Sequence, residues 1–211
     1  MNLAVRDRES VAEPRTEPPQ VKRQSSKVLP QLFDKLDTRR KLTILEVGRA
    51  LPESVDFFSR LKCRIHILDL YSELKSGHIQ ASSSGRTLQR QFQEVFAFEP
   101  GTELDICLLW DFPHYLDEKQ LRAFSGALWP WLNPGSRAHC FGVHSAATQL
   151  LNREYGIVDR HTLSVRHRVT EQMKNSPHPQ SFMNEWLTCF AASSGVLLPD
   201  GKIETLMRST V

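Results

Sequence analysis

The sequence predicts an α/β fold: an open, mostly parallel twisted sheet with helices on both faces and a C-terminal antiparallel hairpin. Three observations carry this prediction. Short apolar runs rich in β-branched residues alternate with longer segments of helical periodicity, which is typical of parallel sheets. Two of the apolar runs end at Gly48 and Asp69, where tight turns into helices are expected. The last two runs flank Pro199-Asp200-Gly201, which indicates a hairpin turn.

The length of 211 residues and the hydrophobic content of 40% suffice for one domain with a buried core. Residues 1–25 contain three prolines and many charges but few large apolar side chains, so they are expected to form a disordered tail. Residues 26–211 are expected to form the domain, with an insert at about 145–179. No internal repeat is visible.

The first half of the domain reads as helix, strand, helix, strand. Apolar residues recur at helical spacing over 28–36, and the segment 42–50 holds an apolar, β-branched run that ends at Gly48. Pro52 suits the first turn of the next helix. Residues 63–70 form a second buried strand, and a helix joining two such strands implies a right-handed parallel crossover.

The middle of the domain continues the alternation. After a serine and glycine break at 82–85 an amphipathic helix is expected, and no convincing strand lies between 70 and 103. Residues 103–112 are the third clear strand. A helix over 117–132 begins at Asp117 as its N-cap, and 136–143 form the fourth strand after an Asn-Pro-Gly turn.

The alternation becomes irregular after residue 144. The insert is expected to hold a helix-like piece at 146–156, a polar alternating stretch at 157–169 and a loop closed by 176–179. Such a segment is where a lid or a surface for a protein partner is expected. A helix over 181–193 and a hairpin over 195–208 complete the chain.

Composition excludes several classes of protein. Lys and Arg number 27 against 24 Asp and Glu, and the basic residues at 160–168 alternate with apolar ones, so a solvated strand face is favoured and no nucleic-acid partner is expected. No apolar run is long enough for a membrane span and no signal peptide is seen, so a cytoplasmic location is expected. The spacing of cysteines and histidines predicts no metal site, and the cysteines are expected to be buried thiols.

Several motifs, over about residues 30–209, resemble those of class I S-adenosylmethionine-dependent methyltransferases, which have a Rossmann-like fold. ILEVG at 44–48 is similar to the first-strand motif of that family, and HILDL at 66–70 to its second. LDICLLWDFPHYLD at 104–117 resembles the fourth-strand motif, and the closing helix and hairpin resemble the antiparallel end of the family's sheet. The resemblance implies S-adenosylmethionine as cofactor and a methyl acceptor that is a small molecule or a protein.

The resemblance also implies which residues meet the cofactor. Glu46 would organise the cofactor loop, Gly48 and Ala50 would lie against the methionine end, and Asp69 would accept the ribose hydroxyls. The family pattern is E-x-G-x-G-x-G, and the chain has Ala50 and Pro52 in place of two of its glycines. The alternative roles are a polar strand end for Asp69 and a capped or solvent-linked acid for Glu46.

Asp111, His114 and Tyr115 form the candidate catalytic cluster, because an imidazole beside a carboxylate can take a proton from an attacking oxygen or nitrogen. The alternative is a helix-capping loop with an exposed histidine. Two hypotheses for the whole protein follow: a methyltransferase, or a catalytically inactive protein of this fold that binds another protein through the insert. A third hypothesis is a nucleotide-binding module unrelated to methyl transfer. It is weaker, because the loop after the first strand keeps a single glycine.

Overall fold

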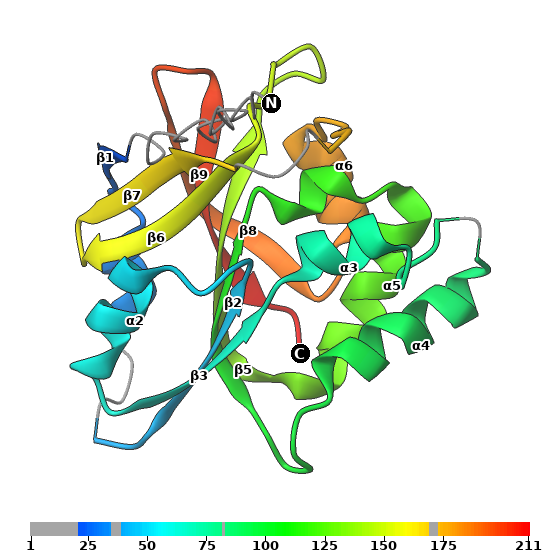
Figure 1. Ribbon diagram of the computed structural model, residues 1–211, viewed down its shortest axis with the longest axis horizontal. Coiled ribbons are helices and arrows are strands. Elements are labelled where there is room, and N and C mark those ends of the chain that lie inside the picture. The colour runs from blue at the N-terminus through cyan, green and yellow to red at the C-terminus, as the bar shows by residue number, and fades with distance from the viewer. Residues whose placement is uncertain (1–20, 35–38, 82, 169–172) are drawn as a thin grey trace, which may run out of the picture.

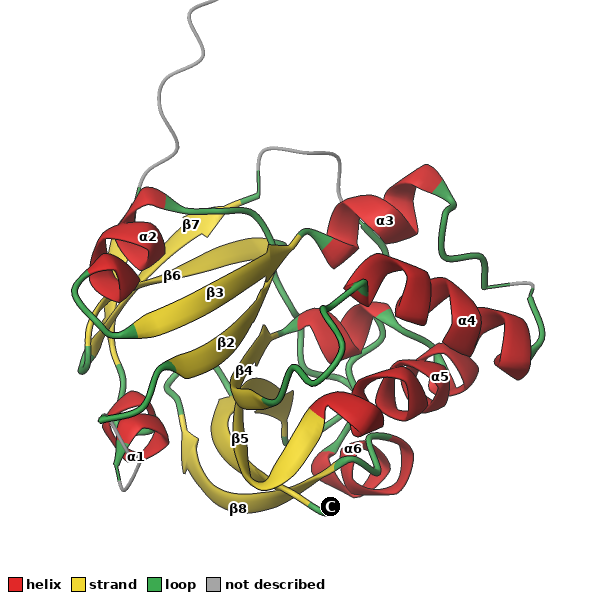
Figure 2. Ribbon diagram, turned by 90° about the horizontal axis from the view of Figure 1, so that it is seen from below, coloured by secondary structure: helices red, strands yellow, loops and turns green. Residues whose placement is uncertain are grey.

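The computed structural model describes residues 21–34, 39–81, 83–168 and 173–211. It contains a six-stranded sheet in the order β3-β2-β4-β5-β9-β8 and a three-stranded sheet in the order β1-β7-β6. The larger sheet runs through the middle of the molecule, with helices on one side and the smaller sheet with further helices on the other (Figures 1 and 2). The predicted fold class is therefore confirmed.

The larger sheet is parallel over its first four strands and antiparallel at its C-terminal end. β2 pairs with β3 and β4, and β4 pairs with β5, all in parallel. β9 pairs antiparallel with both β5 and β8. The strands are β2 (Leu42–Val47), β3 (Cys63–Leu68), β4 (Leu104–Trp110), β5 (Leu132–Val143), β8 (Phe190–Leu197) and β9 (Lys202–Ser209).

One face of this sheet is covered mainly by helices. Leu45 and Val47 point to this face and pack in a core that includes Phe92, Phe124 and Met183. The helices are α3 (Leu70–Ser76), α4 (Gly85–Phe96), α5 (Glu118–Leu128) and α6 (Gln180–Trp186). A reciprocal capping box between Asp117 and Gln120 begins α5, so the predicted N-cap is confirmed.

The other face is covered by a mixed layer. It consists of β1 (Lys22–Ser25), β6 (Arg153–Asp159) and β7 (Thr162–His167) with α1 (Leu29–Phe33) and α2 (Pro52–Ser59). Ile44 and Leu108 of the large sheet pack here against Tyr155, Ile157 and other residues of the small one. Because the strands β2 and β4 are buried on both faces, they read as continuous apolar runs.

The structure differs from the sequence predictions in the insert and at the edges. Residues 153–156, predicted to end a helix-like piece, begin β6, because their burial comes from pairing with β7 and packing under α2. Residues 190–193, predicted as the end of a helix, belong to β8, which pairs with β9. The short helix α3 was not predicted, and the residues that the structure describes between β3 and β4 form no strand, as expected.

The predicted disordered tail covers two different parts. Residues 1–20 lie outside the described residues, as do 35–38 at the end of the first predicted helix, residue 82 in the predicted break and 169–172 in the insert. Residues 22–25 form β1, because the strand pairs with β7 and Ser26 beside it donates a hydrogen bond to the buried Glu204 at 2.6 Å. Long-range pairing thus orders a segment whose own composition favours disorder.

Three global features bear on function. Within the described part of the chain, no helix has the length and apolar character needed to cross a membrane. The four cysteines are free, three of them buried and Cys63 half-buried. The described part of the chain contains no group of three or more histidine, cysteine or acidic side chains arranged to hold a metal ion.

Candidate functional site

Gly48, Asp69 and Asp111 follow the ends of three neighbouring parallel strands. Gly48 follows β2, Asp69 follows β3 and Asp111 follows β4, and the order of these strands is β3-β2-β4. The carboxyl ends of parallel strands lie at one edge of a sheet, where open α/β folds bind their ligands. The predicted common rim is therefore present.

Gly48 has the backbone geometry that the predicted loop requires. Its φ of 127° lies in a region that residues with a Cβ rarely adopt, and its N–H donates to the Leu68 carbonyl at 2.8 Å. A Cβ at this position would lie 3.7 Å from the ring of Tyr71. Ala50 is exposed to solvent, and Pro52 opens α2, as expected.

Asp69 caps the short helix that follows it. One carboxylate oxygen accepts the Ser72 hydroxyl at 2.7 Å, and the other accepts the Ser72 N–H at 3.3 Å. The side chain is half-buried at the rim. This arrangement is the polar strand end of the alternative interpretation, and a ribose would have to share these oxygens with Ser72.

Glu46 points away from the helical layer and is buried below α2. Its Oε1 accepts the Ser54 hydroxyl at 2.8 Å, and Ser54 in turn accepts the N–H of Ile157 in β6 at 3.1 Å. Its Oε2 has no partner in hydrogen-bonding geometry among the described residues. Burial raises the pKa of Glu46 to about 7, and the Ser54 hydroxyl and the Trp110 indole offset part of this rise. Glu46 therefore connects β2, through Ser54 of α2, to β6 in the insert.

Asp111 is fully buried and serves as an acceptor within the protein. The Tyr71 hydroxyl donates to it at 2.7 Å and the Tyr155 hydroxyl at 3.3 Å. Burial raises the pKa of Asp111, while the Tyr71 hydrogen bond and the charges of Arg168 and Lys202 act in the opposite direction. The carboxylate is thus surrounded by the protein's own donors.

His114 is held by both ring nitrogens. Nε2 donates to the Phe141 carbonyl at 2.9 Å, and Nδ1 accepts the His178 N–H at 3.0 Å, which requires the neutral ring. Burial lowers the pKa of His114 to about 4. Neither nitrogen is directed at a cavity where it could take a proton from a substrate.

Tyr115 completes the predicted catalytic group. It is buried, its hydroxyl donates to Asn152 at 3.2 Å, and its ring meets Tyr71 edge to face at 5.2 Å. The structure therefore brings both Asp111 and Tyr115 into contact with Tyr71. His114 lies in the same turn but faces β5 and the segment before α6.

Side chains occupy the space above Gly48. Only about 10 Å³ of free volume remains there, whereas pockets for small ligands usually hold about 300 to 1,000 Å³. The Arg168 guanidinium lies 3.6 Å from the centre of the Tyr71 ring, and Arg49 and Glu154 approach to 3.8 Å across the loop. The residues that line this space are Val47, Gly48, Arg49, Leu51, Tyr71, Trp110, Glu154, Tyr155 and Arg168.

Sequence reasoning missed the residues that fill this space. Tyr71 comes from α3, Tyr155 from β6 and Arg168 from the position after β7. Lys202 of β9 supports this group, because its Nζ donates to the Tyr155 hydroxyl at 3.3 Å. One signal was present: tyrosine and lysine inside otherwise apolar segments need polar partners when buried. The sequence alone does not identify those partners.

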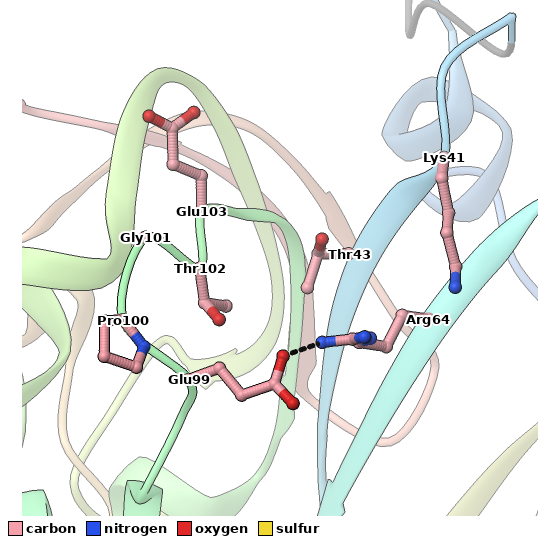
Figure 3. Close-up of a pocket in the computed structure, with 8 residues that line it drawn as sticks. All are labelled: Lys41, Thr43, Arg64, Glu99, Pro100, Gly101, Thr102 and Glu103. Atoms are coloured by element: carbon pink, nitrogen blue, oxygen red, sulfur yellow. Dashed lines mark hydrogen bonds and ion pairs between the residues drawn. The ribbon is translucent and has the colours of Figure 1, made fainter.

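A larger cavity lies at the opposite end of the sheet. It has a volume of about 240 Å³ between the starts of β2 and β3 and the loop at 99–103 (Figure 3). Lys41 and Thr43 line one side, and an ion pair of 2.6 Å joins Arg64 to Glu99 across it. It contains none of the predicted site residues, and its lining is polar and open to solvent.

The comparisons with known proteins agree with this topology. No protein family model and no curated protein matches the chain. Among solved structures, LepI in complex with S-adenosylmethionine is 10% identical, with a TM-score of 0.51 over 88% of this chain and 47% of LepI. A pericyclic reaction enzyme gives the same values.

Two further solved structures are similar at lower scores. An S-adenosylmethionine-dependent methyltransferase from Clostridium acetobutylicum is 13% identical, with a TM-score of 0.46 over 79% of this chain and 83% of that one. The glycopeptide N-methyltransferase MtfA with S-adenosyl-L-methionine is 13% identical, with a TM-score of 0.43 over 85% and 92%. The similarity to LepI, together with the strand order and the rim of Gly48, Asp69 and Asp111, shows that the chain has a Rossmann-like α/β fold that it shares with this S-adenosylmethionine-bound protein.

Proposed function

We propose that this protein is a catalytically inactive member of the methyltransferase-like fold that acts by binding another protein through the insert at about 145–179. The observation that carries the proposal is the closed crevice above Gly48, where about 10 Å³ is free. The residues there, as they stand, do not fit S-adenosylmethionine, because the rings of Tyr71 and Tyr155 and the Arg168 guanidinium occupy the space between the strand ends.

The hydrogen bonds of the crevice support the same proposal. Asp111 accepts two tyrosine hydroxyls, and His114 uses both ring nitrogens within the protein. A general base needs a free lone pair directed at the substrate. The groups that the sequence offers for catalysis are therefore engaged in holding the insert and the turn after β4 against the sheet.

A methyltransferase remains the second candidate. The rim of Gly48 and Asp69 favours it, and so do the solved neighbours that hold S-adenosylmethionine. It requires Tyr155 and Arg168 to leave the crevice, which breaks the hydrogen bonds to Asp111 and Asn152. The fold does not decide between the candidates, because the same fold serves different reactions.

Isothermal titration with S-adenosylmethionine and S-adenosylhomocysteine tests the proposal. We expect a Kd weaker than about 1 mM for both ligands, since the described residues leave only about 10 Å³ free in the crevice above Gly48. An active methyltransferase titrated with the same ligand stocks is the control for ligand quality. Micromolar binding that Asp69→Ala abolishes would overturn the proposal and establish the second candidate.

A further inference from the structure

One end of the small sheet extends beyond the core. Leu163, Val165 and His167 alternate along β7 and so lie on one face of the sheet. Leu163 is fully buried and Val165 nearly so, while His167 is exposed. The face of the small sheet that packs on the large sheet is therefore exposed to solvent at the C-terminal end of β7.

Basic residues of the neighbouring strands lie beside the exposed C-terminal end of β7. Lys22 of β1 lies opposite Val165, and Arg153 of β6 lies opposite His167, so these four residues share the face. A cavity of about 320 Å³ is hollowed here. A second cavity of about 210 Å³ shares Leu151 and His167 with the first, so the two form one groove.

The charge of the groove is only partly neutralised. Arg153 pairs with Asp200 at 3.1 Å, and Arg166 pairs with Glu53 on α2. Among residues 21–34, 39–81, 83–168 and 173–211, no carboxylate pairs with Lys22 or Arg23, and both side chains are exposed. Lys22 therefore offers its charge on the groove face, and Arg23, which lines the cavity but lies opposite Ser164 on the other face of the strand, offers a second cation at the edge of the groove.

Apolar side chains accompany these cations. Leu151 in the groove is 43% exposed, and Val21, which precedes Lys22 in the chain, is 46% exposed. Among the described residues, no phenylalanine, tyrosine or tryptophan lines either cavity, and His167 is the single aromatic ring there that could stack on a base. A narrow groove with mixed cationic and aliphatic lining suits a polypeptide better than a nucleic acid.

We propose that this groove, which we name the β1–β7 groove, binds an acidic extended segment of a protein partner. Carboxylates of the segment pair with Lys22 and Arg23, and its aliphatic side chains pack on Leu151 and Val165. The proposal rests on the proposed function as an interaction module, for which it specifies the surface and the chemistry of the partner.

Fluorescence anisotropy with the full chain tests the groove. The probe is a short labelled peptide in which glutamate alternates with valine, and the same peptide with glutamine in place of glutamate is the uncharged control. We expect saturable binding of the acidic peptide that the double variant Lys22→Glu, Arg23→Glu weakens about tenfold or more, because attraction becomes repulsion. The uncharged peptide is expected to bind at least about tenfold more weakly than the acidic one.

The matched control reverses two cations elsewhere. Arg86 and Lys119 are exposed on α4 and α5, in the helical layer on the other face of the large sheet. The double variant Arg86→Glu, Lys119→Glu changes the net charge equally and should leave peptide binding within about twofold of the native chain. Thermal unfolding checks that both variants fold, and Lys22→Gln, Arg23→Gln replaces the glutamate variant if it does not.

Four results would overturn the inference. They are the absence of saturable binding by the native chain, an equal loss of binding in both charge-reversal variants, stronger binding of oligothymidylate that depends on Lys22 and Arg23, and a concentration-dependent dimer that needs the same two residues. The last two would assign the groove to a nucleic acid or to a second copy. Micromolar cofactor binding together with intact peptide binding would refute the proposed function alone.

Discussion

Glu46→Gln is the substitution that most directly tests the electrostatics of the site. Glu46 is 1% exposed, and only one of its carboxylate oxygens has a partner in hydrogen-bonding geometry. Glutamine keeps the size of the side chain and can still accept the Ser54 hydroxyl through its carbonyl oxygen. The substitution therefore removes the charge while it retains the packing and the link to the insert.

The size of the effect follows from the raised pKa. A carboxyl that titrates at about 7 in the folded protein and at 4.5 in the unfolded chain binds its proton more tightly when folded. Its contribution to stability is fully present below pH 4.5 and is lost as the pH rises to about 7. The two pKa values correspond to a loss of about 3 kcal/mol, treated as an upper bound.

Urea denaturation of native chain and variant between pH 4 and pH 8 measures this loss. We expect equal free energies of unfolding near pH 4, a difference that grows between pH 4.5 and 7, and a variant more stable by up to about 3 kcal/mol at pH 8. Glu94→Gln, at an exposed position on α4, is the control and should change stability by less than about 0.5 kcal/mol. A difference that does not vary with pH, or a variant that is less stable at pH 8, would refute the reasoning.

Three further predictions concern the same site. Tyr155→Phe removes a hydroxyl that donates to the buried Asp111, so the free energy of unfolding should fall by about 1 to 3 kcal/mol in urea denaturation; an unchanged value would mean that this hydroxyl does not support the carboxylate. The lowered pKa of His114 stabilises the fold above pH 6.5 and this stabilisation is lost as the pH falls toward 4, so its ring signals in NMR should not titrate until about pH 4; titration near 6.5 would contradict the buried neutral ring. Gly48→Ala forces a Cβ into a backbone conformation with φ of 127°, so thermal unfolding should show a loss of about 1 to 3 kcal/mol, and a neutral result would argue against this loop geometry.

Much of the sheet could be predicted from local pattern. The apolar runs of β2, β3 and β4 are recognisable because strands buried on both faces contain few polar residues, and the glycine or acid that ends each run marks the rim. The capping box of α5 and the hairpin at Pro199-Asp200-Gly201 depend on neighbours in the chain. Such elements can be predicted because the interactions that form them join residues close together in the sequence.

The insert and the closed crevice could not be predicted in this way. β1 and β6 are strands because each pairs with β7 and packs against the large sheet, which no property of their own short segments indicates. Whether Asp111 faces a substrate or two tyrosines depends on Tyr71, Tyr155 and Lys202, which approach it only after folding. The sequence by itself determined the α/β topology and the rim of Gly48, Asp69 and Asp111, because periodicity and turn chemistry are local. Only the tertiary structure decided that the space above this rim is filled, because volume and hydrogen-bond partners depend on residues far apart in the chain.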